Sequence, residues 1–441
     1  MTQDVSELDP ISLEILANGL RSIADECFIA LMRSAYSTNI KERKDHSIAI
    51  LDKKGRLVVQ AARTLPIHIG SMSGLMRCVL EKYGDDIAEG DIFVANDPHT
   101  AGGSHLPDIN YAKPIFMNGE VVAFICNIAH HADVGGMVPG SMAGGMSEIY
   151  QEGLRIPVVK LFSRGELQAD IMDLILLNVR APEERRGDHN AQIASCNLGS
   201  RRFHEVVNAY GLANVLVAFD EIIARTSKRM RLAFAEIPDG TYHFEDFMDG
   251  DGIDTFDIPI RLALTVAGDT ISFDFAGTSP QVGGNINTTM NAVQASVSYA
   301  LIAVLDSDIP SNQGVLDVVE IKAEPGTILN SVFPAPVAAR AHTCQRAIDV
   351  VLGALSQALP DKVIAAANGA NTTAVFAGVD PRNNQPYVYL ETLGGGMGAR
   401  SSKDGKDGVQ VHITNTSNLP VESIEQEYPL RVEEYSLVQD S

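Results

Sequence analysis

Two apolar runs joined by Asn118-Gly119 constrain the fold of this chain more than any other segment. The first run is "NYAKPIFM" and the second is "EVVAFICNIAHH". An Asn-Gly pair between two β-prone runs is typical of a two-residue turn in an antiparallel hairpin. Pairing about that turn places Asn110 and its neighbours opposite the region of Ala129. The hairpin therefore returns the chain that precedes its first strand to the end of its second strand.

Side chains that can bind a metal gather at both ends of this hairpin. His105 and Asp108 precede the first strand, whereas His130, His131 and Asp133 lie at or after the end of the second. Two imidazoles and a carboxylate can form a divalent-metal site with open positions for water and substrate. This mixed nitrogen and oxygen set suits Mn, Fe or Zn better than Mg or Ca. The alternative is a group of hydrogen-bonded loop residues packed beneath the neighbouring glycines.

The rest of the chain alternates helical and strand patterns, which indicates an α+β (mixed α/β) fold with mixed and antiparallel sheets and long helices. Asp9-Pro10 is a helix start, because Asp is a preferred N-cap and Pro fits the first turn. The predicted helices are 10–31, 71–83, a sustained helical pattern over 183–236, 292–305 and 344–358, and the predicted strands lie in 47–60, 90–97, 241–248, 256–266 and 270–277. The break at Pro238-Asp239-Gly240 predicts two tightly packed lobes, 1–238 and 239–441.

Charge and composition exclude several classes of function. The formal net charge is −22, from 56 acidic and 34 basic residues, and no basic stripe is visible, so a nucleic-acid partner is not expected. No apolar run reaches the roughly 18 residues of a membrane span, and the first residues lack the features of a secretory signal. We therefore expect a cytoplasmic protein without a membrane partner. The five scattered cysteines suit reduced core thiols, with a catalytic thiol as the alternative.

Two further segments have both a functional and a structural interpretation. "NIKERKDHS" is a solvated charged turn by default, but Arg43 or Lys41 could contact an anionic substrate or a phosphorylated intermediate, so Arg43 is a candidate catalytic residue. "LETLGGGMGAR" formally matches a dinucleotide fingerprint, yet a polar, turn-forming stretch follows it where a phosphate-binding helix would be required. The sequence also lacks a P-loop and a G-x-S-x-G elbow.

Several segments together carry a family likeness: "NIKERKDHS", "QAARTLPIHIGSM", "NDPHTAGGSHLPD", "AHHADVGGMVPGSM", "EIYQEGLRIP", "ETLGGGMGAR" and "EYPLRVEEY". In this order they resemble the hydantoinase B, oxoprolinase and acetone/acetophenone carboxylase family through almost the whole chain. The resemblance implies an ATP-dependent hetero-oligomer. A hydantoinase A-like partner with an actin-like ATPase fold would bind ATP and phosphorylate a carbonyl oxygen of an amide or ketone, and this subunit would hold a divalent metal.

The resemblance also implies which residues act. The two His and one Asp that bind metal in the carboxylases fall on His105, Asp108 and His130, although His130 and His131 could exchange roles. The leading hypothesis is the metal-dependent subunit of an N-methylhydantoinase/5-oxoprolinase-type hydrolase of cyclic amides, in which His131 or Asp133 handles the proton. The alternatives are an acetone/acetophenone-type carboxylase subunit that acts on a ketone and a non-catalytic scaffold that only binds the ATPase partner.

The chain departs from the family pattern at a few positions. His99 stands where many relatives have Tyr, and in "RAHTCQR" Arg340 and His342 stand where Asn and Glu are common. We expect Arg340 and His342 to alter the substrate pocket. Family members usually continue past the position of Ser441 with another glycine-rich segment, so this chain is expected to be shorter than its relatives.

Overall fold

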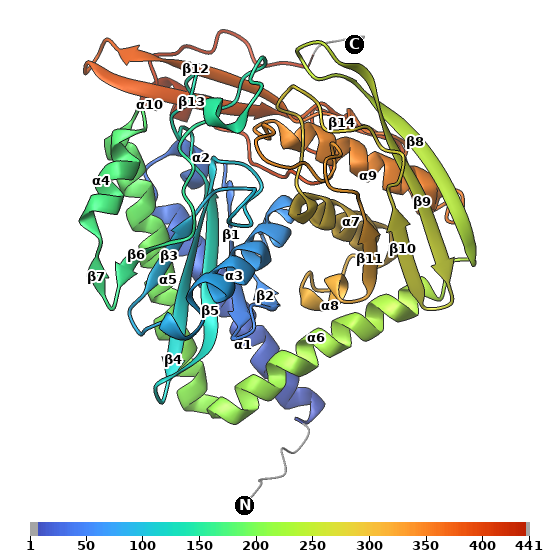
Figure 1. The fold of residues 1–441 in the computed structure, drawn as a ribbon, viewed down its shortest axis with the longest axis horizontal. Helices are drawn as coiled ribbons and strands as arrows, with labels where there is room; N and C mark the ends of the chain where they lie inside the picture. The colour runs from blue at the N-terminus through green and yellow to red at the C-terminus, as the bar shows by residue number, and fades with distance from the viewer. Residues whose placement is uncertain (1–7, 438–441) are drawn as a thin grey trace, which may run out of the picture.

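The computed structural model describes residues 8–437 and confirms a mixed fold of long helices and two main sheets (Figure 1). The larger sheet has seven strands, all antiparallel, in the order β2-β1-β5-β4-β3-β6-β7. Its strands are β1 (His46–Asp52), β2 (Leu57–Gln60), β3 (Ile92–Ala95), β4 (Asp108–Met117), β5 (Glu120–His130), β6 (Val159–Ser163) and β7 (Glu166–Leu167).

The predicted hairpin at Asn118-Gly119 is confirmed, as β4 and β5. Both turn residues have positive φ, 54° and 84°, which is the conformation that a two-residue type I′ turn requires. The register pairs Ile109 with Ala129 and Asp108 with His130. The predicted neighbourhood of Asn110 and Ala129 is therefore correct to within one residue.

The central strands are buried on both faces, and alternate side chains enter two different cores. In β5, Phe124 and Cys126 face the core beneath α3 (Ile69–Tyr83), whereas Ala123 and Ile125 face the core beneath α1 (Pro10–Ser34) and α5 (Pro182–Tyr210). Successive side chains of a strand point to opposite faces, so two-sided burial fixes the register. Asp9 caps α1 as expected, with Oδ1 accepting from the backbone N–H groups of Ile11 and Ser12.

The sustained helix predicted over 183–236 is interrupted at Gly211. Gly211 has φ +84°, a backbone conformation that glycine adopts without a steric penalty. The chain therefore forms two helices, α5 and α6 (Leu212–Phe234), which diverge by 107°. Figure 1 shows α6 running from the base of α5 towards the second sheet.

The second sheet has the order β11-β10-β9-β8, and helices pack against it. It comprises β8 (Gly240–Gly250), β9 (Phe256–Ala267), β10 (Thr270–Asp274) and β11 (Val319–Lys322), with α7 (Met290–Leu305), α8 (Gln313–Leu316) and α9 (Arg340–Ser356) as the helices of this half of the chain. The helix predicted to begin at Cys344 begins four residues earlier, at Arg340. The remaining elements are α2 (Thr38–Lys41), η1 (Pro66–His68), η2 (Gly84–Asp86), η3 (Ile149–Gln151), α4 (Ala169–Leu177), β12 (Thr372–Asp380), β13 (Gln385–Leu393), β14 (Gly396–Met397), β15 (Lys406–Asp407) and α10 (Val421–Glu427).

The two main sheets lie on either side of residue 238 in the sequence, but one hydrophobic core joins them. Met76 of α3 belongs to the same buried cluster as Phe273 of β10 and Leu301 of α7. The division into lobes 1–238 and 239–441 stays a prediction. The shared core means that any two lobes are in extensive apolar contact.

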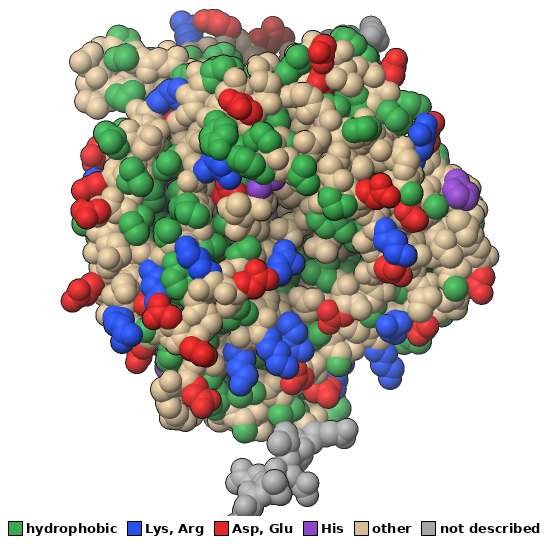
Figure 2. Space-filling model, in the orientation of Figure 1, with side chains coloured by type: hydrophobic (Ala, Val, Ile, Leu, Met, Phe, Trp, Pro, Cys, Tyr) green, Lys and Arg blue, Asp and Glu red, His purple; other side chains and the backbone are tan. Residues whose placement is uncertain are grey.

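Two observations concern membrane-spanning helices and the distribution of charge on the surface. Within residues 8–437, no single helix is both long and apolar enough to cross a membrane; α5 and α6 meet that test only as a strongly bent pair. On the face drawn in Figure 2, acidic and basic side chains are interspersed, without a continuous basic stripe.

The loop before β4 crosses α3 at a contact between two glycines, and this contact generates a prediction. A Cβ added to Gly102, which has φ +75°, would lie 2.1 Å from the carbonyl carbon of Gly74. We expect Gly102→Ala to lower the free energy of unfolding by roughly 3 kcal/mol or more, because strain and overlap act together. Gly119→Ala is the matched control: its φ is +84° with no heavy atom within 4 Å of an added Cβ, so about 1 kcal/mol is expected. Chemical denaturation measures both, and equal losses would contradict the crossing's importance.

Candidate metal centre

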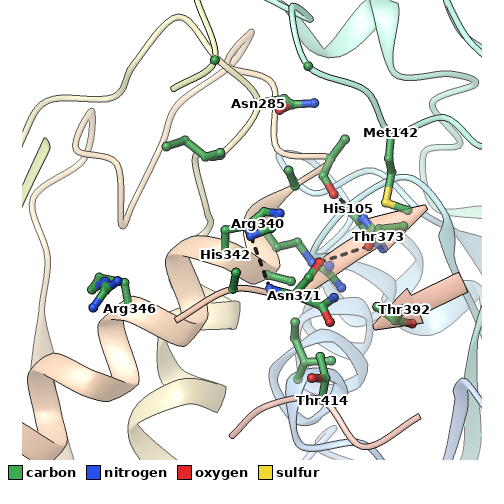
Figure 3. A pocket seen from close by; sticks show the side chains of 18 of the residues that line it. His105, Met142, Asn285, Arg340, His342, Arg346, Asn371, Thr373, Thr392 and Thr414 are labelled. Atoms are coloured by element: carbon green, nitrogen blue, oxygen red, sulfur yellow. Dashed lines mark hydrogen bonds between the residues drawn. The ribbon is translucent and has the colours of Figure 1, made fainter. Parts of the chain in front are cut away.

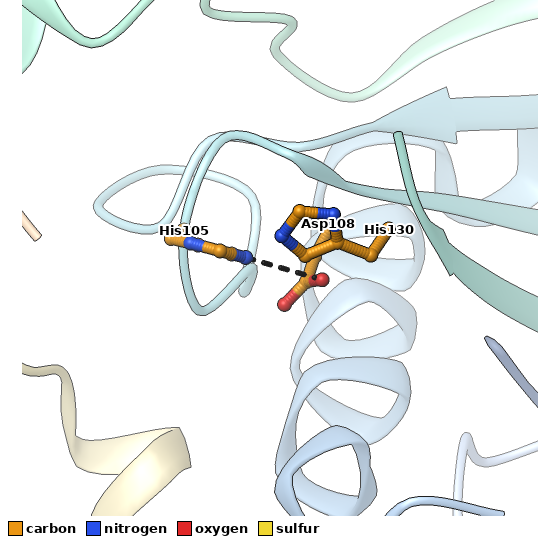
Figure 4. A group of neighbouring side chains, drawn as sticks. All are labelled: His105, Asp108 and His130. Atoms are coloured by element: carbon orange, nitrogen blue, oxygen red, sulfur yellow. Dashed lines mark ion pairs between the residues drawn. The ribbon is translucent and has the colours of Figure 1, made fainter. Parts of the chain in front are cut away.

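The end of the β4–β5 hairpin brings His105, Asp108 and His130 together. Asp108 is the first residue of β4 and pairs directly with His130, the last residue of β5, while His105 lies three residues before Asp108. One potential ligand atom from each side chain lies within 4.8 Å of the other two. Figure 4 shows the two rings around the Asp108 carboxylate, whose Oδ1 is 3.2 Å from His105 Nε2. All three side chains are buried.

Hydrogen bonds from outside the cluster orient both rings. His105 Nδ1 is 2.9 Å from the carbonyl oxygen of Ala338, which can only accept, so Nδ1 carries the proton. Its Nε2 then presents a lone pair towards Asp108. The side-chain amide nitrogen of Asn39 lies 3.1 Å from His130 Nδ1 and 2.7 Å from the His130 carbonyl oxygen. An acceptor on the other ring nitrogen, as Ala338 provides for His105, is typical of histidines that bind metals. Asn39 instead donates to His130 Nδ1, so the neutral His130 ring carries its proton on Nε2, and a metal bound at Nε2 would displace that proton.

The charges of the cluster fit a cation. Burial lowers the pKa of His105 and lowers that of His130 well below its usual value, so both imidazoles are neutral near pH 7. Burial alone would raise the pKa of Asp108, but the Arg340 guanidinium beside it holds that pKa well below its ordinary value. His105 Nε2 and Asp108 Oδ1 are buried acceptors that face each other without a hydrogen-bond partner. A divalent cation between them would satisfy both atoms.

The second oxygen of Asp108 is already saturated by protein donors. Arg340 Nη2 lies 2.5 Å from Asp108 Oδ2, and the hydroxyl of Ser104 donates to the same oxygen at 2.7 Å. Arg340 Nε in turn donates to Ser104 Oγ at 3.0 Å. This closed triangle fixes the carboxylate and leaves Oδ1 as its available oxygen.

Two further polar residues at the centre were given no role in the sequence analysis. His68, at the end of η1, places Nε2 3.6 Å from Asp108 Oδ1 and 3.9 Å from Asp45 Oδ1. The carbonyl oxygen of Asp45 accepts the backbone N–H of His130, because β1 runs beside β5. Both residues lie in segments quoted for the family likeness. Asp45 reaches the hairpin end through the β1–β5 pairing, and His68 reaches it from η1, where its Nδ1 lies 2.8 Å from Ser47 Oγ of β1. No local sequence pattern predicts either contact.

A cavity of about 530 Å³ opens onto these residues. Its inner wall is formed by Asp45, His68, His105, Asp108, His130 and Arg340. Its outer wall includes His342 and Arg346 of α9, Asn371 and Thr373 near β12, and Met142, as Figure 3 shows. The cavity therefore lies where the hairpin, α9 and the C-terminal strands meet, and it contains the predicted pocket residues Arg340 and His342.

His131 points away from this cavity. Its Nε2 is 2.9 Å from Gln192 Oε1, and its ring lies 4.7 Å from that of His189, both on α5. The reason is strand parity: His130 continues the α3-side face of β5, and the next residue turns to the α5 side. The structure thus brings His130, and not His131, to the candidate ligand set.

The other two predicted catalytic residues, Asp133 and Arg43, form hydrogen bonds that join separate backbone segments. Asp133 accepts from the backbone N–H groups of Gly135 and Gly140 and pairs with Arg180. Arg43 is fully buried and donates to the carbonyl oxygen of Leu390 at 2.7 Å. Neither residue lines the cavity, so the geometry lends no support to a catalytic role for them or for His131.

Glu152 is a buried carboxyl group that the sequence analysis missed. Its Oε1 accepts the backbone N–H groups of Val337 and Ala338 at 2.6 and 2.7 Å, and Ala338 in turn accepts from His105. Glu152 therefore positions the carbonyl group that orients His105. Burial raises the pKa of Glu152 to about 8, and its Oε2 has no hydrogen-bond partner among the described residues. No sequence pattern marks this residue, because its partners lie about 185 positions away.

The raised pKa of Glu152 predicts a pH-dependent gain from Glu152→Gln. The folded protein holds this proton up to about pH 8, whereas an unfolded Glu releases it near pH 4.5. The free energy of unfolding of the wild type therefore falls as pH rises between these two values. Gln cannot ionise and can still accept both N–H bonds. Relative to wild type, its melting temperature should rise progressively from pH 5, by at least about 2 °C at pH 8.5.

Differential scanning calorimetry between pH 5 and 9 measures this difference. Glu14→Gln is the control, because it makes the same chemical change at an exposed position of α1, where burial does not act on the side chain. A Glu152→Gln gain that is constant with pH, or that grows towards acid pH, would contradict the assignment.

Comparisons with known proteins match this chain over almost its whole length. A family model described as "Hydantoinase B/oxoprolinase" matches residues 9–441. The B subunit of a putative D-/L-hydantoinase from Pseudomonas sp. is 33% identical over 98% of this chain and 75% of its own length. The crystal structure of an ATP-dependent caprolactamase from Pseudomonas jessenii matches with a TM-score of 0.92 at 31% identity, over 99% of this chain and 76% of that one. A nucleotide-free acetone carboxylase structure has a TM-score of 0.89 at 20% identity, over 98% and 59%, and shows the shared fold alone.

Proposed function

This chain belongs to the hydantoinase B/oxoprolinase family, and from that premise we propose that it is the metal-dependent subunit of an ATP-dependent hydrolase of cyclic amides. One observation carries the metal part of the proposal: the lone pairs of His105 Nε2 and Asp108 Oδ1 face each other, buried and unpartnered, at the wall of a cavity. The cyclic-amide part rests on the hydantoinase and caprolactamase names of its relatives.

The reaction is divided between two subunits in this proposal. A hydantoinase A-like partner binds ATP and phosphorylates the carbonyl oxygen of the amide, which makes a poor electrophile reactive. This chain then receives the activated ring in its cavity. The sequence has no P-loop, and relatives are named as one subunit of a larger enzyme, which supports a hetero-oligomer.

The chain's own residues prepare the reacting site. His105, Asp108 and His130 would hold a divalent ion, with Mn, Zn and Fe the candidates, and that ion would supply Lewis-acid activation of water or of the carbonyl oxygen. The carbonyl oxygen of Ala338 and the amide of Asn39 hold the two rings in register. The buried setting limits access of bulk water, which strengthens electrostatic interactions with the substrate.

Asp108→Asn tests the metal assignment. The substitution keeps the shape of the side chain but removes the charge that faces His105, so metal bound per complex should fall at least about tenfold at limiting metal. ATP-coupled opening of hydantoin or lactam rings should fall with it. Elemental analysis of the purified complex and assays on a panel of hydantoins, lactams and ketones measure the two effects.

Asp91→Asn is the matched control, because Asp91 is equally buried but lies just before β3, where it accepts from the backbone N–H groups of Ala88 and Arg164. Full metal content in Asp108→Asn, or full turnover after chelation, would overturn the proposal. ATP-dependent incorporation of labelled bicarbonate into a ketone would instead identify a carboxylase. A complex that binds no divalent ion would identify a scaffold.

A further inference from the structure

Arg340 is a cation at the cavity wall, and only some of its N–H donors have a hydrogen-bond partner. It is the first residue of α9, and its side chain is 5% exposed. Nε donates to Ser104 and Nη2 to Asp108, but within residues 8–437 Nη1 has no hydrogen-bond partner. Nη1 is not fully buried. Because Arg340 lines the cavity, this indicates that Nη1 reaches the cavity space. A rigid guanidinium fork with a free arm is suited to bind an oxyanion.

The charge around the centre favours an anion next to Arg340. Asp45 and Asp108 are the two carboxylates at the inner wall, and they would balance one divalent ion. The Arg340 cation is then left without a compensating carboxylate at this inner wall. Asp249 and Asp251 line the same cavity, but within residues 8–437 Arg340 forms an ion pair only with Asp108. Asp251 accepts instead from the backbone N–H groups of Ile253, Asp254, Thr255 and Gly284.

His342, two residues further along α9, lines the same cavity and supplies a second donor. The backbone N–H of Asn371 donates to His342 Nδ1 at 3.3 Å, so a neutral ring carries its proton on Nε2 (Figure 3). Burial lowers the pKa of His342, which keeps the ring neutral near pH 7. Arg346 differs from Arg340, because Asp246 at 2.6 Å and Asp349 at 3.8 Å already compensate its charge.

We propose that Arg340 and His342 form an oxyanion subsite of the cavity, which selects cyclic amides that carry an anionic oxygen group. The group is either a carboxylate borne by the ring or the phosphoryl group of the activated amide. The identity of the ring rests on the proposed function, whereas the preference for an oxyanion rests on the two side chains.

Calorimetric binding to the purified complex, without ATP, tests the subsite. The probes are 2-pyrrolidone against its 5-carboxylate, hydantoin against hydantoin-5-acetate, and inorganic phosphate. A carboxylate source predicts that the anionic ring binds at least about tenfold more tightly than the neutral ring. A phosphoryl source predicts binding of phosphate with no preference between the rings. Absence of both results overturns the subsite.

Variants separate recognition from support of the fold. Arg340→Gln and His342→Phe should each lose at least about fivefold of the anion preference, and His342→Phe leaves the contact between Arg340 and Asp108 in place. Arg346→Gln is the control and should keep the preference. An equal loss of neutral and anionic ligands would mean a structural role and overturn the proposal.

Repeating the titrations with EDTA separates Arg340 from a bound ion. A preference that disappears with EDTA but survives Arg340→Gln would also overturn the subsite. The two proposals fail separately, because binding is measured without turnover. Anion preference without metal-dependent hydrolysis would remove only the proposed function, and hydrolysis without anion preference would remove only the subsite.

Discussion

The pairing of Asp108 with His130 at the open end of the β4–β5 hairpin is the constraint on which the candidate centre depends. The turn at Asn118-Gly119 pairs Met117 with Glu120, and a register shift between Ile115 and Phe116 moves the remaining pairs by one residue, so that Asp108 meets His130. Burial of both faces of the hairpin stabilises this register through packing. A slip by one residue would exchange the apolar sets of the two cores and turn His130 towards α5. The chemistry at one end of the hairpin is therefore fixed by backbone geometry at the other.

Local signals in the sequence were sufficient for much of the fold. The hairpin, the capped first helix and the strands after Gly240 follow from turn chemistry, capping and periodicity, each of which acts within a few residues. The ligand candidates could be predicted for the same reason, since one hairpin carries them all. Gly211 was not recognised as a break, because an isolated glycine inside a helical pattern is usually tolerated and only its φ of +84° distinguishes this one.

Residues that reach the centre through tertiary contacts could not be predicted in the same way. Asp45 and His68 arrive beside β5 through the β1 strand and the η1 turn, and Glu152 acts through a backbone segment remote in the sequence. His131 and His130 differ only in which face of the strand they occupy, and parity at a strand end depends on the full register. The solvated charged turn predicted around Arg43 was wrong for Arg43 itself. Its side chain is buried and donates a hydrogen bond to the carbonyl oxygen of Leu390.

The two oxygens of Asp108 divide the centre into a part that the protein completes and a part that it leaves open. Ser104 and Arg340 saturate Oδ2, so that oxygen cannot rotate towards an ion without breaking two buried hydrogen bonds. Oδ1 faces His105 Nε2, and neither atom has a donor. A buried acceptor without a partner costs free energy, and folding alone leaves both of these atoms without one. A cation bound between them would remove that cost. The guanidinium of Arg340 that fixes Asp108 also lines the cavity, so in the proposed subsite one side chain would both orient the metal ligand and bind the anionic group of the substrate.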